Sequence, residues 1–143
     1  MDESKRQHLE FIQNVITRMN TNSFQIKGMA ITIVSALLAI YASTANIVFI
    51  FLSIAPTILF WFLDSYYLQL EHKYRKLYEN VCGLKNDKEI KQYDLSIKDF
   101  KCCFCKIFFS ETIALLYGTI VSLLLLCGLI IKYKDCIIII NCK

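Results

Sequence analysis

The stretch that decides the fold is Gly28 to Leu63, GMAITIVSALLAIYASTANIVFIFLSIAPTILFWFL, which contains no Asp, Glu, Lys or Arg. Asn46 divides it into windows of 18 and 17 residues. At 1.5 Å per residue each window forms a helix roughly 26 Å long, close to the roughly 30 Å hydrocarbon core of a bilayer. A third uncharged window of 20 residues runs from Thr112 to Ile131. The sequence therefore predicts an all-α membrane protein with three transmembrane helices.

The composition agrees with this prediction. Hydrophobic residues make up 56% of the 143 residues, and counting Gly in place of Tyr still gives about 53%, above the roughly 45 to 50% of soluble domains. All the charged residues lie outside the three windows. This segregation argues against a secreted enzyme, a zinc module or a nucleic-acid-binding domain. The length allows one small domain, which we expect to be a membrane domain covering residues 1–143.

The basic residues predict the orientation. Four Lys or Arg precede the first window, nine lie between Leu68 and Phe109, and none lies in the short link Thr44 to Asn46. By the positive-inside rule, the N-terminus and the long loop are cytoplasmic. Three spans then place the C-terminus outside, although Lys132, Lys134 and Lys143 are basic.

The chain divides into six expected segments. We predict an amphipathic helix at 1–22, spans at 23–45 and 46–66, a cytoplasmic helix and connector at 67–109, a span at 110–132 and an external tail at 133–143. The first segment carries its apolar residues on one side of a helix, namely Leu9, Phe11, Ile12, Val15, Ile16 and Met19. Such a helix lies at the membrane interface or against a partner helix.

Several local signals refine these boundaries. The polar run Asn20 to Ser23 is typical of a break with a cap for the next helix. Strong helix formers precede Gly83, so the second helix is expected to extend beyond the membrane. Pro56 predicts a kink in it, with Ser53 and Thr57 near enough to satisfy the carbonyl that the proline frees.

Two signals concern the second half of the chain. Ser96 and Asp99 have capping-box spacing, which predicts an interfacial helix running into the third span. The β-branched run Cys136 to Ile140 is too short to cross a membrane and is consistent with a strand at an oligomer rim.

Small side chains recur along the third span. Ser110, Ala114, Gly118 and Ser122 stand four residues apart and form a stripe on one helix face, which we call the α-stripe. Because lipid supplies no hydrophobic drive between helices, close approach over small residues is a main source of association. Ser35 and Ala39 lie on a similar face of the first span. We expect these six positions to pack helices and subunits together, the alternative being that they line a water path.

Polar residues follow the second uncharged window on the same predicted helix. Asp64, Glu71 and Arg75 fall within about 40° of one another on a helix, flanked by Tyr67 and Tyr78. We call these five residues the polar ladder. It is either an interfacial Asp followed by an ordinary Glu71–Arg75 pair, or a charge network between subunits at the cytoplasmic mouth of a pore.

The sequence shows no signature of catalysis or cofactor binding. It has no Gly-rich phosphate loop, no nucleophile elbow and no paired acid and base, so we predict that the protein is not an enzyme and needs no cofactor or metal. The cluster Cys102, Cys103 and Cys105 lacks a second ligand pair for zinc. Cys136 and Cys142 would face outside, where they can form a disulfide. The basic loop lacks the aromatic spacing of nucleic-acid platforms, so no nucleic acid is expected as a partner.

Two stretches carry a resemblance to known proteins. The run from Arg6 to Phe24, RQHLEFIQNVITRMNTNSF, and the run from Phe60 to Leu68, FWFLDSYYL, with Glu71, Arg75, Leu77 and Tyr78 after it, resemble small bacterial multi-span membrane proteins of antiphage defence neighbourhoods. The resemblance covers about residues 5 to 80. The cysteine-rich stretch and the Ile-rich tail depart from it. It implies a bacterial inner-membrane protein that acts as a membrane-disrupting effector or its anchor.

The functional hypothesis combines both lines of reasoning. We expect a homo-oligomeric pore or membrane-perturbing effector whose partners are the lipid bilayer and other copies of the chain. The alternative is an anchor or scaffold that recruits a soluble cytoplasmic defence protein.

Overall fold

A computed structural model of the chain describes the backbone of residues 3–83 and 93–141 and the side chains of residues 3–83 and 93–133. Within these residues all regular structure is helical: α1 spans Glu3–Thr44, α2 Val48–Cys82, α3 Phe104–Phe108 and α4 Glu111–Asn141. The three long helices are each long and apolar enough to cross a membrane. The predicted all-α class with three candidate spans is therefore confirmed.

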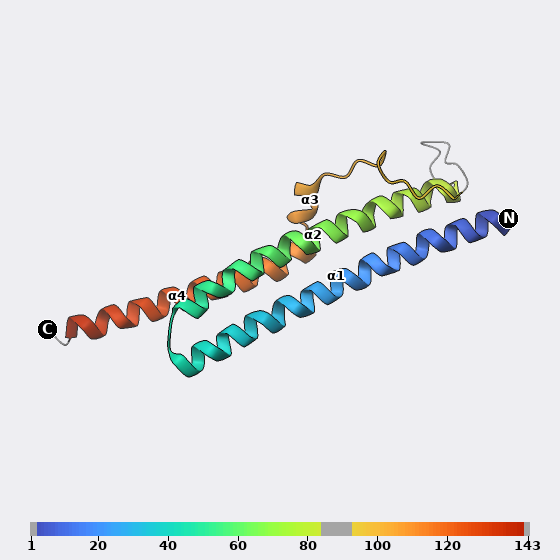
Figure 1. Cartoon of the computed structure of the whole chain (residues 1–143). Coiled ribbons are helices and arrows are strands. Elements are labelled where there is room, and N and C mark those ends of the chain that lie inside the picture. Colours follow the sequence, from blue (N-terminus) through green and yellow to red (C-terminus); the bar gives the residue numbers. More distant parts are fainter. Residues whose placement is uncertain (1–2, 84–92, 142–143) are drawn as a thin grey trace.

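The helices form an elongated bundle around α2 (Figure 1). α1 and α2 make an antiparallel hairpin, and α4 packs on α2. Side chains of α1 and α4 also share two buried clusters, one with Ala30 and Tyr117 and one with Val34 and Leu124. No Cα atoms of α1 and α4 come within 8 Å of each other. α4 starts beside the middle of α2 and runs past the α1–α2 turn (Figure 1).

α1 is one continuous helix, so the separate amphipathic helix expected at 1–22 is not what the structure contains. The polar residues between 17 and 23 do not interrupt it, because their hydroxyls find partners without leaving the helix. Thr17 Oγ1 donates to the Gln13 carbonyl and Thr21 Oγ1 to the Thr17 carbonyl, each at 3.0 Å. Such bonds to the preceding turn satisfy the hydroxyl while the helix continues.

α2 also extends far beyond one membrane thickness. Its 35 residues correspond to about 52 Å. It runs through Pro56, where Ser53 and Thr57 donate to the carbonyls of Phe49 and Ser53 and not to that of Leu52. It ends before Gly83, which adopts a left-handed φ of 82° that an L side chain disfavours.

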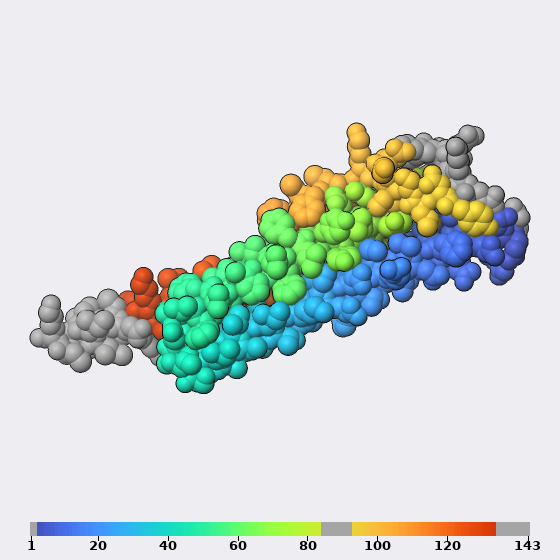
Figure 2. Space-filling view, viewed as in Figure 1, coloured from blue at the N-terminus to red at the C-terminus, as the bar shows by residue number. Residues whose placement is uncertain are grey.

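The end of the hairpin away from the turn, residues 3–27 of α1 and 64–82 of α2, is called the stalk here. Ile12, Ile16 and Leu77 are buried in it, and Ile97 and Phe100 of the segment 93–103 pack against them. Burying each of these large side chains from water contributes about 1.5–3 kcal/mol. Figure 2 shows the segment before α3, in yellow, lying over α2 and reaching the first turns of α1.

Two further expectations differ from the structure. The predicted helix from Ser96 is absent: the Ser96 amide bonds to Asp94 Oδ1 at 2.8 Å, and the regular helix α3 covers only five residues. The backbone of Cys136–Ile140 belongs to α4, so it is helical and not a strand, because the helix of the third span continues through it. The Cys136 side chain and Cys142 lie outside the described residues.

Candidate functional site

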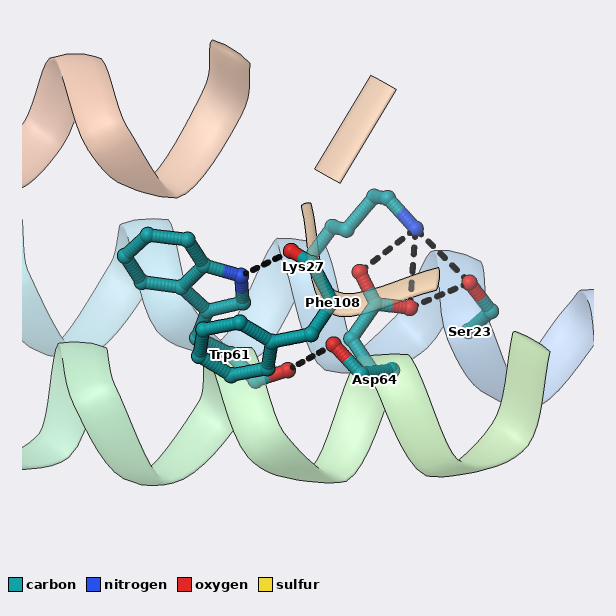
Figure 3. Close-up of polar contacts among 6 residues, drawn as sticks. Ser23, Lys27, Trp61, Asp64 and Phe108 are labelled. Carbon is teal, nitrogen blue, oxygen red and sulfur yellow. Dashed lines mark hydrogen bonds and ion pairs between the residues drawn. The ribbon is translucent and has the colours of Figure 1, made fainter. Parts of the chain in front are cut away.

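A buried ion pair joins α1 to α2 at the base of the stalk (Figure 3). Lys27 Nζ lies 2.7 Å from Asp64 Oδ2 and 2.9 Å from Asp64 Oδ1. Ser23, one turn earlier on α1, donates its hydroxyl to Asp64 Oδ1 and accepts a hydrogen bond of 2.7 Å from Lys27. The Asp64 side chain is completely buried, whereas that of Lys27 is 27% exposed. We call Ser23, Lys27 and Asp64 the junction site.

The antiparallel hairpin itself explains why these residues meet. Lys27 stands 18 residues before Ala45, and Asp64 stands 18 residues after Asn46. The tight turn lies at Ala45 and Asn46. Because the two helices run the same number of residues away from it, Lys27 and Asp64 lie at the same level of the hairpin. Each charge also borders an uncharged window of its own helix. At about 27 Å from the turn, the junction site falls where one face of a bilayer's hydrocarbon core would end.

Aromatic rings hold α3 and α4 next to the junction site. The Trp61 ring stacks on Phe108 of α3 with ring centroids 4.6 Å apart and on Tyr117 of α4 with centroids 6.1 Å apart. Trp61 Nε1 donates to the Phe108 carbonyl at 3.0 Å (Figure 3). The Tyr117 ring is buried together with Ala30, Ile107 and Ile113. All four helices therefore meet at this level of the bundle.

The Tyr117 hydroxyl is the polar group of α4 at this level. It lies close enough to the Asp64 carboxylate to interact with it electrostatically. It forms no hydrogen bond of ordinary geometry with any described residue.

The predicted polar ladder is divided within one chain. Asp64 pairs with Lys27 of α1, whereas Glu71 pairs with Arg75 on the same helix, Arg75 Nη2 to Glu71 Oε1 at 2.7 Å. Tyr67 is half-buried and contacts the edge of Tyr66, and Tyr78 is half-buried in the stalk. The Glu71–Arg75 pair has the ordinary i,i+4 geometry, and its Arg75 side chain is 55% exposed.

The small residues lie on two different surfaces. Ser35 lines a groove of about 220 Å³ between α1 and α4 whose α4 wall is Ile120, Leu123, Leu124 and Cys127. None of the four α-stripe residues lines this groove. A Cβ added at Gly118 would meet nothing within 4 Å, Ser122 and Ala39 are exposed, and Ser110 and Ala114 are half-buried. Most of the surface around these small residues is therefore left uncovered by the chain itself.

The junction site is suited to holding α1 and α2 in place. Among the described residues no three His, Cys, Asp or Glu side chains converge as metal ligands. The two charges of the junction site neutralise each other, and the Ser23 hydroxyl between them is engaged as a donor to Asp64 and an acceptor from Lys27. A buried charge pair is best attested as a device that fixes register. Here a slip of one helical turn between α1 and α2 would separate Lys27 from Asp64.

Sequence reasoning found Asp64 but missed its partners. It assigned Ser23 to a helix cap and counted Lys27 only toward the orientation. Counting residues outward from the turn would have paired Lys27 with Asp64. No comparable signal indicated that Trp61 bonds to Phe108, because the course of the 93–103 segment depends on tertiary packing.

The hydrogen bond of Trp61 gives a direct test of how α3 is held. We expect Trp61→Phe to keep the stacking but lose the bond to the Phe108 carbonyl, which lowers the free energy of unfolding by about 1 kcal/mol. Circular dichroism during thermal unfolding in detergent measures the loss. Phe62→Leu, which also alters a contact with the Phe108 ring but no hydrogen bond, is the matched control. Equal unfolding of wild type and Trp61→Phe would show that the bond does not hold α3.

Comparisons with known proteins add no family assignment. No protein-family model, curated protein or solved structure matches the chain.

Proposed function

We propose that the chain is an integral protein of the bacterial inner membrane, with the stalk in the cytoplasm and the C-terminus outside. Large apolar side chains that face outward support this placement, among them Leu59, Leu115 and Leu129, which are 64–70% exposed. In water so much exposed apolar surface would be unfavourable, whereas lipid tails solvate it. The excess of Lys and Arg on the side of the stalk supports the orientation.

The function best supported is that of a homo-oligomer that opens a path through the membrane or otherwise perturbs it. One observation carries this proposal: the chain leaves two small-residue faces uncovered, and they lie on different sides. A face on α4 around Gly118 that binds a different face on α1 around Ser35 makes a head-to-tail contact. Such contacts form a ring when the rotation between successive copies closes, and we propose a closed ring here. Three spans in one copy are too few to enclose a conduit, but a ring of copies provides one.

In this proposal the polar ladder and the N-terminal half of α1 surround the cytoplasmic mouth. The exposed Arg75 side chain lies on the stalk, where charges of neighbouring copies would meet, whereas the Glu71 carboxylate that it binds is buried. An activating partner must bind the open state more tightly than the closed state to shift the population between them. The resemblance described above supports a role as an effector in antiphage defence. We assign no catalytic role and no cofactor.

The proposed pore can be tested by its effect on the membrane potential. Expression of the wild-type chain in bacterial cells is expected to dissipate the potential, read by a voltage-sensitive dye. Gly118→Leu is expected to prevent this, because a bulky side chain blocks close approach on the α-stripe. Leu126→Ala, which changes an exposed side chain of the same helix, is the matched control. An unchanged potential with the wild-type chain, even in phage-infected cells, would contradict the pore.

One observation favours the alternative of a membrane scaffold. Phe11 of the stalk and Tyr93 of the segment 93–103 are 51% and 47% exposed, with ring centroids 6.3 Å apart. An aromatic pair exposed outside the bilayer is a typical anchor for a partner protein. Crosslinking in native membranes distinguishes the two functions. A scaffold yields one soluble protein whose capture is lost in Phe11→Ala, whereas the effector yields adducts between copies of this chain.

A further inference from the structure

A basic cavity lies where α2, α3 and the start of α4 meet, separate from the junction site. Its volume is about 350 Å³, which is within the lower range of ligand pockets. The cavity is lined by His72 and Lys76 of α2, Lys101, Cys102 and Cys103 of the segment before α3, Lys106 and Ile107 of α3, and Ser110. Three lysines and a histidine thus line it, and none of these described lining residues is acidic.

The walls of the cavity are held by α2. Lys76 Nζ donates to the Lys101 carbonyl and Gln69 Nε2 to the Cys102 carbonyl, each at 2.9 Å. These bonds fix the backbone from which Lys101 projects. Lys101 and Lys106 form no ion pair with a described carboxylate, and both are exposed. Two positive charges therefore remain uncompensated at the mouth of a structured cavity.

Ser110 completes the cavity on the side of α4. Its Oγ is buried and has no hydrogen-bond partner among the described residues. It also immediately precedes α4, which begins at Glu111. The N-terminus of a long helix favours an anion, because its first amide groups lack partners within the helix. An anion with several acceptor oxygens would satisfy both the hydroxyl and the lysines.

We propose that this cavity binds the phosphate headgroup of an anionic phospholipid. The uncharged window of the third span starts two residues after Ser110, which places the cavity at the level of the headgroups. Basic pockets between helices on the cytoplasmic side of membranes are typical sites for such lipids. A bound headgroup would tie the start of α4 to α2 and α3. The inference rests on the proposed membrane placement but not on the pore.

The test uses the full chain in nanodiscs of phosphatidylcholine with a minor fraction of phosphatidylglycerol. Native mass spectrometry after release measures the retained phosphatidylglycerol. A lysine near an anionic headgroup contributes about a factor of five in affinity. We therefore expect Lys101→Gln with Lys106→Gln to weaken retention by about 30-fold, and Lys106→Gln alone by about fivefold. Lys101→Arg with Lys106→Arg, which keeps both charges, should retain the lipid.

The matched control removes two charges elsewhere. Lys98 and Lys132 are exposed and do not line the cavity, so Lys98→Gln with Lys132→Gln should retain phosphatidylglycerol like the wild type. Equal retention in the cavity variant and this control would overturn the proposal. Displacement of the lipid by inorganic phosphate at millimolar concentration would overturn it too, in favour of a soluble phosphate ligand. A chain that retained the lipid without affecting membrane potential would contradict the pore alone.

Discussion

Lys27→Met is expected to lower the free energy of unfolding by about 3–5 kcal/mol, the cost of leaving one charge of a buried pair uncompensated. The loss should be large because Asp64 has no exposed surface through which water could replace the lysine. Ser23 would remain as a hydrogen-bond donor to Asp64, with the Tyr117 hydroxyl close enough to interact electrostatically. Unfolding of the chain in mixed micelles, followed by the fluorescence of the single tryptophan, measures the change.

Three further variants separate the charge effect from loss of packing. Asp64→Leu should cost less than Lys27→Met, since the Lys27 side chain is 27% exposed and can extend toward water. The double variant Lys27→Met with Asp64→Leu should recover most of the free energy of unfolding that Lys27→Met loses. The reason is that an apolar pair of similar volume often replaces a buried ion pair without cost. Arg6→Met, which breaks the exposed Arg6–Glu3 pair, is the control for a solvated pair and should cost less than about 1 kcal/mol. If Lys27→Met cost no more than this control, the junction site would not hold the hairpin.

The class of the fold could be predicted because it depends on long runs of uncharged residues. Such runs leave little choice of structure in a membrane, since every backbone group must find its partner within the helix. The end of α2 before Gly83 was predictable for a similar local reason. The continuity of α1 was not, because Thr17 and Thr21 bond inside the helix, and local patterns alone do not distinguish this from a cap.

The course of the chain between α2 and α4 could not be predicted for a different reason. Ser96 and Asp99 have the spacing of a helix start, but the Ser96 amide bonds to Asp94. The carbonyls of Lys101 and Cys102 accept hydrogen bonds from side chains of α2. These distant partners replace the bonds that a helix would have formed, so tertiary contacts override the local signal.

The candidate site shows the same limit. The sequence identifies Asp64 as a costly charge at a membrane edge. Helical spacing, however, relates it only to residues of its own helix. Glu71 and Arg75 lie on its face at helical spacing, and they pair with each other. The partner that buries Asp64 comes from α1, and it is found only when the two helices are set side by side.

Two glycines of α4 offer the sharpest test of the proposed assembly. A Cβ at Gly118 would meet open space, whereas a Cβ at Gly128 would lie 3.2 Å from Phe51 Cζ. Gly118→Leu should therefore leave the monomer as stable as the wild type or more so, because leucine favours a helix over glycine by up to about 1 kcal/mol. In the oligomer the same side chain prevents close approach of helices. We expect association to weaken by at least about tenfold, or ~1.4 kcal/mol.

Gly128→Leu is the matched control, because it places the same side chain on the same helix where the monomer has no room. It should lower the free energy of unfolding by roughly 1–3 kcal/mol through overpacking against Phe51. Unfolding in detergent measures this loss, and crosslinking followed by size-exclusion chromatography measures association. Gly118→Leu is thus expected to weaken association without destabilising the monomer, whereas Gly128→Leu is expected to destabilise the monomer. Each substitution is a control for the effect of adding a leucine elsewhere on α4. Unchanged association of Gly118→Leu would show that the α-stripe faces lipid, and the ring of copies would have to be abandoned.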